Sequence, residues 1–225
     1  MVRFEKTVKD LHQQLYVDRI QPPSFRQIDV SLWAACRYTA QNPALAGKEI
    51  GFIDIGLGLT ERIAKGSFEI IGALSSTGTC SFHPKISAEE INSTFGFGER
   101  WEKLEHEHNS HYYQMRFAMN YWLAVRDIAA YSKVHCAHFF CLDETVVDMI
   151  ADSSASNVID FCNANPKLHQ FVLTCRTEDC EEIISIVNDS TLTTRQKKYA
   201  LSIAQMRKEL HSCMIAMSQQ KGVAQ

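Results

Sequence analysis

The stretch LWAACR at residues 32–37 recurs 89 residues later as YWLAVR at residues 121–126. The two stretches share the pattern W-x-A-x-R, so two of the three tryptophans in the chain occupy matching positions. The spacing of apolar residues predicts a helix around each stretch, over residues 28–40 and 112–132. The pattern therefore indicates that one helical unit occurs twice in this chain.

A second pair of matching stretches follows in the same order. LTERIAKGS at residues 59–67 aligns with VVDMIADSS at residues 146–154, at an offset of 87. After each stretch the periodicity predicts another short helix, over residues 68–74 and 156–163. Because Trp, Ala, Arg and Ser recur at matching positions in one order, duplication explains the pattern better than the apolar spacing that any two helices share.

The rest of the sequence also favours helices. Strand patterns are rare, and residues 171–173 and 79–82 are the two β candidates. Charged helices are predicted near the N-terminus and over residues 99–108, and a further helix over residues 143–151. We therefore expect an all-α protein with at most a few short strand residues.

Composition sets limits on the class of protein. Of the 225 residues, 45% are apolar and 22% are charged, and the formal net charge is −3. This apolar fraction excludes a disordered chain, and no apolar run reaches the roughly 18 to 20 residues of a membrane span. The first residues lack the apolar core of a secretion signal, and the eight cysteines contain no C-x-x-C pair. We expect a cytoplasmic protein without membrane contacts, in which most cysteines are reduced core residues.

Motifs for catalysis and cofactor binding are scarce. The sequence contains no G-x-S-x-G, P-loop or H-E-x-x-H motif, and GLG at residues 56–58 lacks the third glycine of a dinucleotide site. We therefore expect no enzymatic activity, no cofactor, no metal and no small-molecule substrate. The alternative is a zinc-dependent enzyme or sensor built on His135, Cys136, His138 and Cys141, although structural zinc sites usually add a second, distant pair of ligands.

The second copy resembles the flagellar transcriptional regulator FlhD, from about residue 114 to about residue 210. Residues 115–128 look like the long first helix of that family, and AHFFCLDE at 137–144 resembles its A-M-F-R-L-G-I-N-E segment. NDS at 188–190 corresponds to the Q-D-S that opens the family's C-terminal arm. The first copy, about residues 26–95, resembles the same core without the arm.

Two positions depart from the family pattern. The family's Phe-Arg-Leu-Gly is replaced in the second copy by a stretch without arginine, at residues 139–142 or 138–141 depending on the register. The family's cysteine before x-F corresponds to Cys80 in the first copy and to His169 in the second. The cysteine through which the family can form an intersubunit disulfide therefore occurs in one copy only.

The resemblance implies a fused pseudodimer. FlhD-like proteins are homodimers of intertwined, mostly helical subunits that act with FlhC-like partners to activate transcription at promoter DNA. Joining two such units in one chain removes the concentration dependence of dimerisation. The predicted organisation is an N-terminal helix (1–25), a first repeat (26–95), an acidic linker helix (96–111), a second repeat (112–189) and a basic helical arm (190–225).

The C-terminal arm is the best candidate for contacts with a partner. Residues 190–221 contain six bases and one acid, whereas residues 140–189 contain ten acids and two bases. Thr193 or Thr194 is expected to cap a helix with an apolar stripe in steps of three and four. The stripe is expected to dock on the body or on an FlhC-like subunit, and its residues are Tyr199, Ile203, Met206, Leu210 and Met214.

The basic residues of the arm are the candidates for phosphate contacts. Lys197 and Lys208 fall on the face opposite the stripe. The predicted DNA-binding residues are Arg195, Lys197, Lys198, Arg207 and Lys208. A simpler alternative is a solvated amphipathic helix with ordinary surface lysines.

The resemblance therefore implies a transcriptional regulator that acts with an FlhC-like partner at promoter DNA, on flagellar or conjugative-transfer genes. Because the net charge is −3, its DNA contacts are expected to be auxiliary. The alternative is a helical protein-interaction module that binds or inhibits an FlhC-like regulator without touching DNA. The acidic segment favours the module, and the basic arm favours the regulator.

Overall fold

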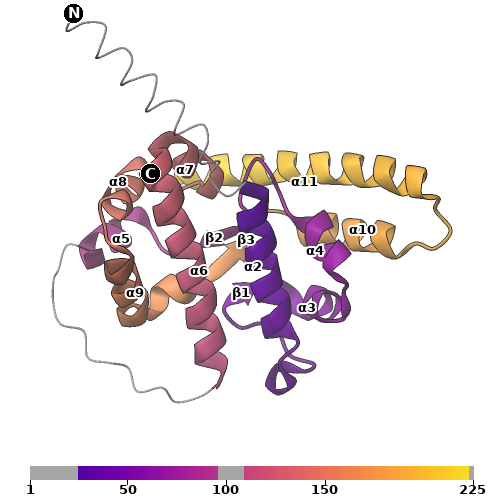
Figure 1. The fold of residues 1–225 in the computed structure, drawn as a ribbon, viewed down its shortest axis with the longest axis horizontal. Helices are drawn as coiled ribbons and strands as arrows, with labels where there is room; N and C mark the ends of the chain where they lie inside the picture. The colour runs from indigo at the N-terminus through magenta and orange to yellow at the C-terminus, as the bar shows by residue number, and fades with distance from the viewer. Residues whose placement is uncertain (1–24, 96–108, 223–225) are drawn as a thin grey trace, which may run out of the picture.

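The computed structural model of the protein describes residues 25–95 and 109–222, and helices predominate in both parts (Figure 1). The described helices of the first part are α2 (Phe25–Ala40), η1 (Pro43–Leu45), α3 (Gly56–Lys65), α4 (Phe68–Leu74) and α5 (Ala88–Phe95). Those of the second part are α6 (Asn109–Tyr131), α7 (Lys133–Phe140), α8 (Glu144–Ala151), α9 (Ala155–Ala164), η2 (Pro166–His169), α10 (Thr177–Asn188) and α11 (Thr194–Gly222). The predicted all-α class is confirmed, while the predicted N-terminal helix and most of the predicted linker helix lie outside the described residues.

The helices α2 and α6 form the centre of the molecule. They pack against each other, with α3 and α4 on α2 and with α7, α8 and α9 on α6 (Figure 1). Trp33 of α2 and Trp122 of α6 are both fully buried. Phe117 of α6 lies edge-on to Phe82 and Phe171, with ring centroids 5.1 and 4.9 Å away. One core therefore joins the two halves of the chain.

A three-stranded sheet crosses this core. β3 (Phe171–Leu173) lies between β1 (Ile53–Asp54), to which it is parallel, and β2 (Phe82–Pro84), to which it is antiparallel. The prediction of a strand at residues 171–173 is confirmed. The candidate at 79–82 is displaced to β2 because the Cys80 N–H donates to Phe139 O at 2.7 Å instead of joining the ladder. β1 was not predicted, since two residues are too few to show a period.

Equivalent contacts occur at the positions that the sequence repeat aligns. Arg37 Nε donates to Gly66 O at 2.8 Å, and Arg126 Nε donates to Ser153 O at 3.1 Å. These are the residues matched at offsets of 89 and 87. Arg37 therefore binds the turn that follows α3, and Arg126 binds the turn that follows α8.

The two segments that the sequence repeat aligns also contact each other in a matched way. β2 and β3 begin 89 residues apart and pair about His83 and Val172, with Phe82 opposite Leu173. The Lys85 N–H donates to Gln170 O, and on the other side the Thr174 N–H donates to Ser81 O. The helix after each strand packs on the other copy: α5 contacts α8, and α10 contacts α3.

The paired tryptophans give a test of the core. The indole N–H of Trp122 donates to Leu168 O at 3.3 Å, whereas that of Trp33 has no acceptor among the described residues. Trp122→Phe removes a hydrogen bond, and Trp33→Phe removes a buried unpaired donor. We expect Trp122→Phe to lower the free energy of unfolding by about 1 kcal/mol more than Trp33→Phe does, as measured by urea titration. An equal or larger loss for Trp33→Phe would contradict this assignment of the two indoles.

Candidate interaction surface on the C-terminal helix

The helix α11 begins with the predicted cap. The Gln196 N–H donates to Thr193 Oγ1 at 3.4 Å, and the Thr193 N–H donates to Gln196 Oε1 at 2.9 Å. This reciprocal pair is a capping box, which satisfies two N–H groups at the start of a helix. From there α11 extends over α10 and the end of α4 along one side of the molecule (Figure 1).

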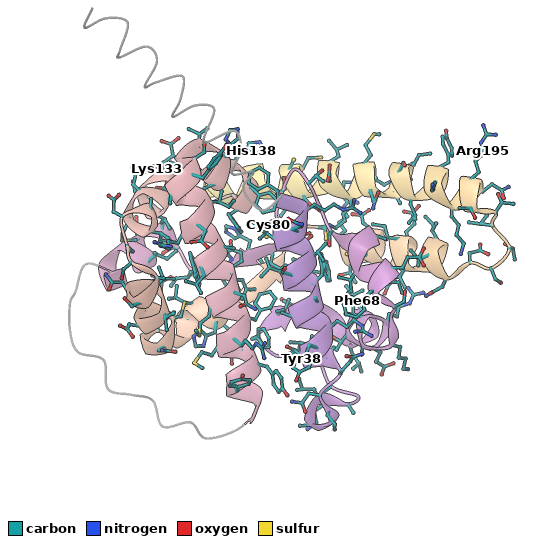
Figure 2. All side chains as sticks on the ribbon, viewed as in Figure 1. Tyr38, Phe68, Cys80, Lys133, His138 and Arg195 are labelled. Carbon is teal, nitrogen blue, oxygen red and sulfur yellow. The ribbon has the colours of Figure 1, made fainter. Side chains whose placement is uncertain are left out.

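The apolar stripe of α11 faces solvent. Tyr199 is 72% exposed and Met206 is 71% exposed, and the other three stripe residues, Ile203, Leu210 and Met214, are exposed as well. Side chains along the outer edge of α11 point away from the body, as does the labelled Arg195 at its first turn (Figure 2). Docking of the stripe on the body, one of the two predicted possibilities, is therefore wrong.

The opposite face of α11 lies against the body, where Ala204 and Leu201 pack on the core beside a group of polar side chains. Lys208 is 1% exposed, and its Nζ donates to Leu74 O, Ser76 Oγ and Ser81 Oγ at 2.6, 2.6 and 2.8 Å. The prediction that Lys208 contacts DNA is wrong, because its ammonium group is enclosed and its three N–H donors have acceptors within the chain.

The end of α4 explains why α11 turns this face inward. The last carbonyls of a helix have no intrahelical donor and favour a nearby cation. At the end of α4, Leu74 O accepts a hydrogen bond from Lys208 of α11, and Ala73 O accepts one from Gln205 Nε2 of α11 at 2.8 Å. Arg26 of α2 donates to Gly72 O at 3.0 Å. α11 thus supplies two of the side chains that cap α4.

A buried carboxylate binds the same two serine residues that accept hydrogen bonds from Lys208. Asp29 of α2 accepts hydrogen bonds from the Ser76 N–H, the Ser81 N–H and the Ser81 hydroxyl, at 2.8, 2.8 and 2.7 Å. Burial acts to lower the pKa of Lys208, but the ionisable groups of Cys175 and Asp29 outweigh it, so that the pKa lies above its usual value. We call Asp29, Ser76, Ser81 and Lys208 the Lys208 network. Its hydrogen bonds connect three elements, which are α2, α11 and the loop that follows α4.

The other predicted DNA-binding residues divide into two groups. Lys197 Nζ donates to Val187 O at 2.8 Å, and Arg207 pairs with Glu182 at 2.7 Å. Arg195 and Lys198 are exposed, and no ion pair of either side chain occurs among the described residues. Two of the five predicted bases therefore remain available at the surface without an internal partner.

Sequence reasoning missed the acceptors that hold α11. Asp29 lies in the predicted helix 28–40, on the same face as Leu32, Trp33 and Cys36. An acidic residue within an apolar stripe is a signal, because a buried carboxylate requires hydrogen-bond donors. Ser76 and Ser81 gave no comparable signal, since serine is common in loops.

The residues of the zinc hypothesis do not converge. Cys136 of α7 is buried and its Sγ donates to Val125 O at 3.3 Å, and Cys141, which follows α7, is buried too. His135 is exposed. His138 is exposed too, as Figure 2 shows. Within residues 25–95 and 109–222, no group of three His, Cys, Asp or Glu side chains could hold a metal ion.

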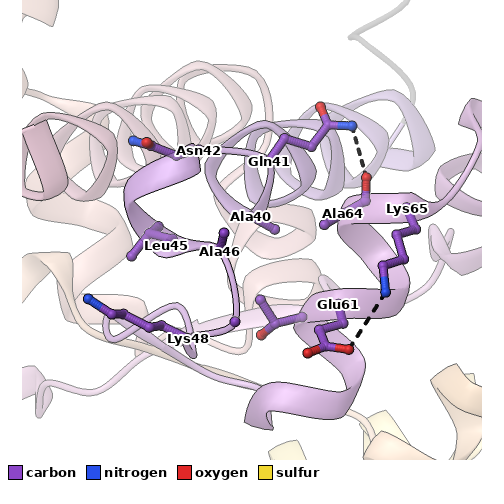
Figure 3. A pocket seen from close by; sticks show the side chains of 11 residues that line it. Ala40, Gln41, Asn42, Leu45, Ala46, Lys48, Glu61, Ala64 and Lys65 are labelled. Atoms are coloured by element: carbon purple, nitrogen blue, oxygen red, sulfur yellow. Dashed lines mark hydrogen bonds and ion pairs between the residues drawn. The ribbon is translucent and has the colours of Figure 1, made fainter.

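A surface hollow of about 400 Å³ lies between the end of α2, the loop after it and α3 (Figure 3). At its rim Gln41 Nε2 donates to Ala64 O at 2.9 Å, and Lys65 lies 3.8 Å from Glu61. These polar groups bind one another, and we assign no ligand to the hollow.

Comparisons with protein-family models, with curated proteins and with solved structures found no match to this chain. None of the helices in the described parts is both long enough and apolar enough to cross a membrane. The function proposed below is therefore argued from the surface of α11 and from the sequence resemblance.

Two lysines of α11 provide a matched test of the Lys208 network. Lys208→Met keeps the length of the side chain but leaves Asp29 and Leu74 O without the ammonium group. We expect this change to lower the free energy of unfolding by roughly 2–4 kcal/mol. Lys198→Met, on the exposed side, is expected to change it by less than about 0.5 kcal/mol. Chemical denaturation of both variants measures the difference, and equal effects would contradict the network.

Proposed function

We propose that this chain is a helical subunit of a transcriptional regulator and that it binds a protein partner through the stripe of α11. The supporting observation is that five large apolar side chains are exposed on a helix whose opposite face is held against the body. Contiguous exposed apolar patches mark interaction sites in soluble proteins. The steps of four, three and four between Tyr199 and Leu210 suit a partner helix packed alongside.

The proposed partner is an FlhC-like regulator. The resemblance to FlhD supplies this identity, and it is strongest in the copy that α11 follows. We also propose a cytoplasmic location, since such a complex acts on promoter DNA. Flagellar and conjugative-transfer genes are both compatible with this role.

We further propose that the two copies form an intramolecular pseudodimer. The antiparallel pairing of β2 and β3 about His83 and Val172 is the arrangement that a twofold axis generates. The matched arginine bonds and the exchange of α5 and α10 between the halves also support it. In this arrangement one copy bears the arm, so the chain presents one stripe to its partner.

The contribution to DNA binding is proposed to be small. Arg195 and Lys198 are the available bases of the predicted set, whereas Lys197 and Arg207 bind groups of the chain itself. Neutralisation of phosphates supplies most non-specific DNA affinity, so two cations add little. This observation also favours the second candidate function, a module that controls an FlhC-like regulator without touching DNA.

Substitutions in the stripe test partner binding. Met206→Glu places a charge at the centre of the stripe, where desolvation on binding is costly. We expect it to weaken binding to a co-expressed FlhC-like protein at least tenfold, as measured by calorimetric titration. Its unfolding midpoint is expected to match that of the unaltered chain, because Met206 is exposed in the free protein.

Met206→Leu is the matched control and is expected to bind within about threefold of the unaltered chain, since it preserves the apolar contact. Equal affinity of the Glu and Leu variants would rule out the stripe as the binding surface.

Gel shifts on promoter DNA separate the two candidate functions. In the activator role, the chain increases the affinity of the FlhC-like protein for DNA. The double variant Arg195→Gln, Lys198→Gln is expected to reduce the slope of log affinity against log salt by about 2. Loss of DNA binding by the partner when this chain is added would contradict the activator role and establish the inhibitor.

A further inference from the structure

Two cysteines meet at the start of α10, beneath α11. Cys175 follows β3 and Cys180 lies in the first turns of α10, and their Sγ atoms are 3.4 Å apart. Arg176 is the N-cap residue of α10. Cys175 therefore precedes the N-cap residue, and Cys180 is the fourth residue of the helix. In many helices two apolar side chains at these positions pack against each other. The local fold of the helix start brings the two sulfur atoms together.

The surroundings make the two thiols unequal. The hydrogen bond between the two thiols lowers the pKa of Cys175, and Lys208 acts in the same direction against the effect of burial. The hydrogen bond to Cys175 and burial raise the pKa of Cys180. By contrast, burial raises the pKa of Cys36 to about 12. Cys175 is also the less enclosed of the two residues, since it is 5% exposed and Cys180 is 0% exposed. We therefore take Cys175 as the thiol that a small peroxide reaches first.

All eight cysteines lie in the described parts of the chain and are reduced. Cys136 donates to Val125 O, Cys141 donates to His138 O and Cys213 contacts Thr79 Oγ1. Within residues 25–95 and 109–222, the hydrogen bond between Cys175 and Cys180 is the one recorded between two thiols. This pair is therefore placed for a reaction that needs two sulfur atoms.

We propose that Cys175 and Cys180 are a dithiol site that reacts with a hydroperoxide to form an intramolecular disulfide. The Cys175 thiolate attacks the peroxide, so that an S–O bond forms, the O–O bond breaks and the departing oxygen takes a proton. Cys180 then attacks the Cys175 sulfur, the S–S bond forms and the second oxygen leaves as water. With hydrogen peroxide, two thiols lose two electrons and two protons, and the peroxide becomes two water molecules.

The disulfide closes a short loop across the start of α10. The bond covalently fixes a contact that the reduced chain already makes, so the fold is expected to persist in both states. Lys208 keeps its acceptors Leu74 O, Ser76 and Ser81, none of which belongs to the dithiol. The reaction is independent of partner binding and is tested on the chain alone.

The test uses the full chain, reduced and then treated with hydrogen peroxide. We expect a mass loss of about 2 Da, two fewer alkylatable thiols and a crosslinked peptide containing Cys175 and Cys180, all reversed by dithiothreitol. In Cys180→Ser the reaction is expected to stop at a sulfenic acid on Cys175, which dimedone traps. Cys162→Ser is the matched control, since Cys162 is also fully buried but lacks a thiol partner in the described chain, and it is expected to oxidise like the unaltered protein.

Retention of all eight thiols under peroxide would overturn the proposal, as would a crosslink between other cysteines. Dimedone labelling of a different cysteine in Cys180→Ser would overturn the assignment of Cys175 as the nucleophile. If either serine variant fails to fold, the peptide map of the unaltered chain decides the question by itself.

Discussion

The ammonium group of Lys208 determines which face of α11 meets the solvent. An enclosed cation is costly unless acceptors surround it. Here the end of α4 presents a free carbonyl and the loop after it presents two hydroxyl groups, while Asp29 supplies the compensating charge and orders that loop. Because these acceptors come from α4 and from the following loop, which Asp29 of α2 holds in place, α11 has one orientation in which Lys208 is satisfied.

This orientation exposes the side chains that a surface helix normally buries. An isolated amphipathic helix on a soluble body turns its apolar face inward. In α11 the polar contacts of Lys208, Gln205 and Lys197 face inward instead, and Tyr199 and Met206 remain in water. Apolar exposure of this extent is consistent with a surface that a partner covers, which is why the proposed function rests on α11. Lys208 also acts to lower the pKa of Cys175, so one buried cation is common to both proposals.

Much of the fold was predictable because two stretches of the sequence share one pattern of residues. The pattern around Trp33 and Trp122 correctly located the two central helices, whereas the bonds of Arg37 and Arg126 to the turns were not predicted. The spacing of apolar residues in α11 correctly identified which side chains share one face of the helix. The spacing does not show whether that face or the opposite one is buried. The burial of Lys208 was missed because its acceptors belong to a segment more than 120 residues earlier in the chain. Asp29 was the residue that could have indicated a buried polar network, since a carboxylate among buried apolar side chains requires hydrogen-bond donors.

The most direct test of the exposed stripe is the rate at which Met206 is oxidised, followed by mass spectrometry in the free chain and in the complex with an FlhC-like protein. Oxidation of methionine follows its exposure to solvent. The account predicts fast oxidation of Met206 in the free chain and at least tenfold protection in the complex. Slow oxidation in the free chain, or equal rates with and without the partner, would contradict it.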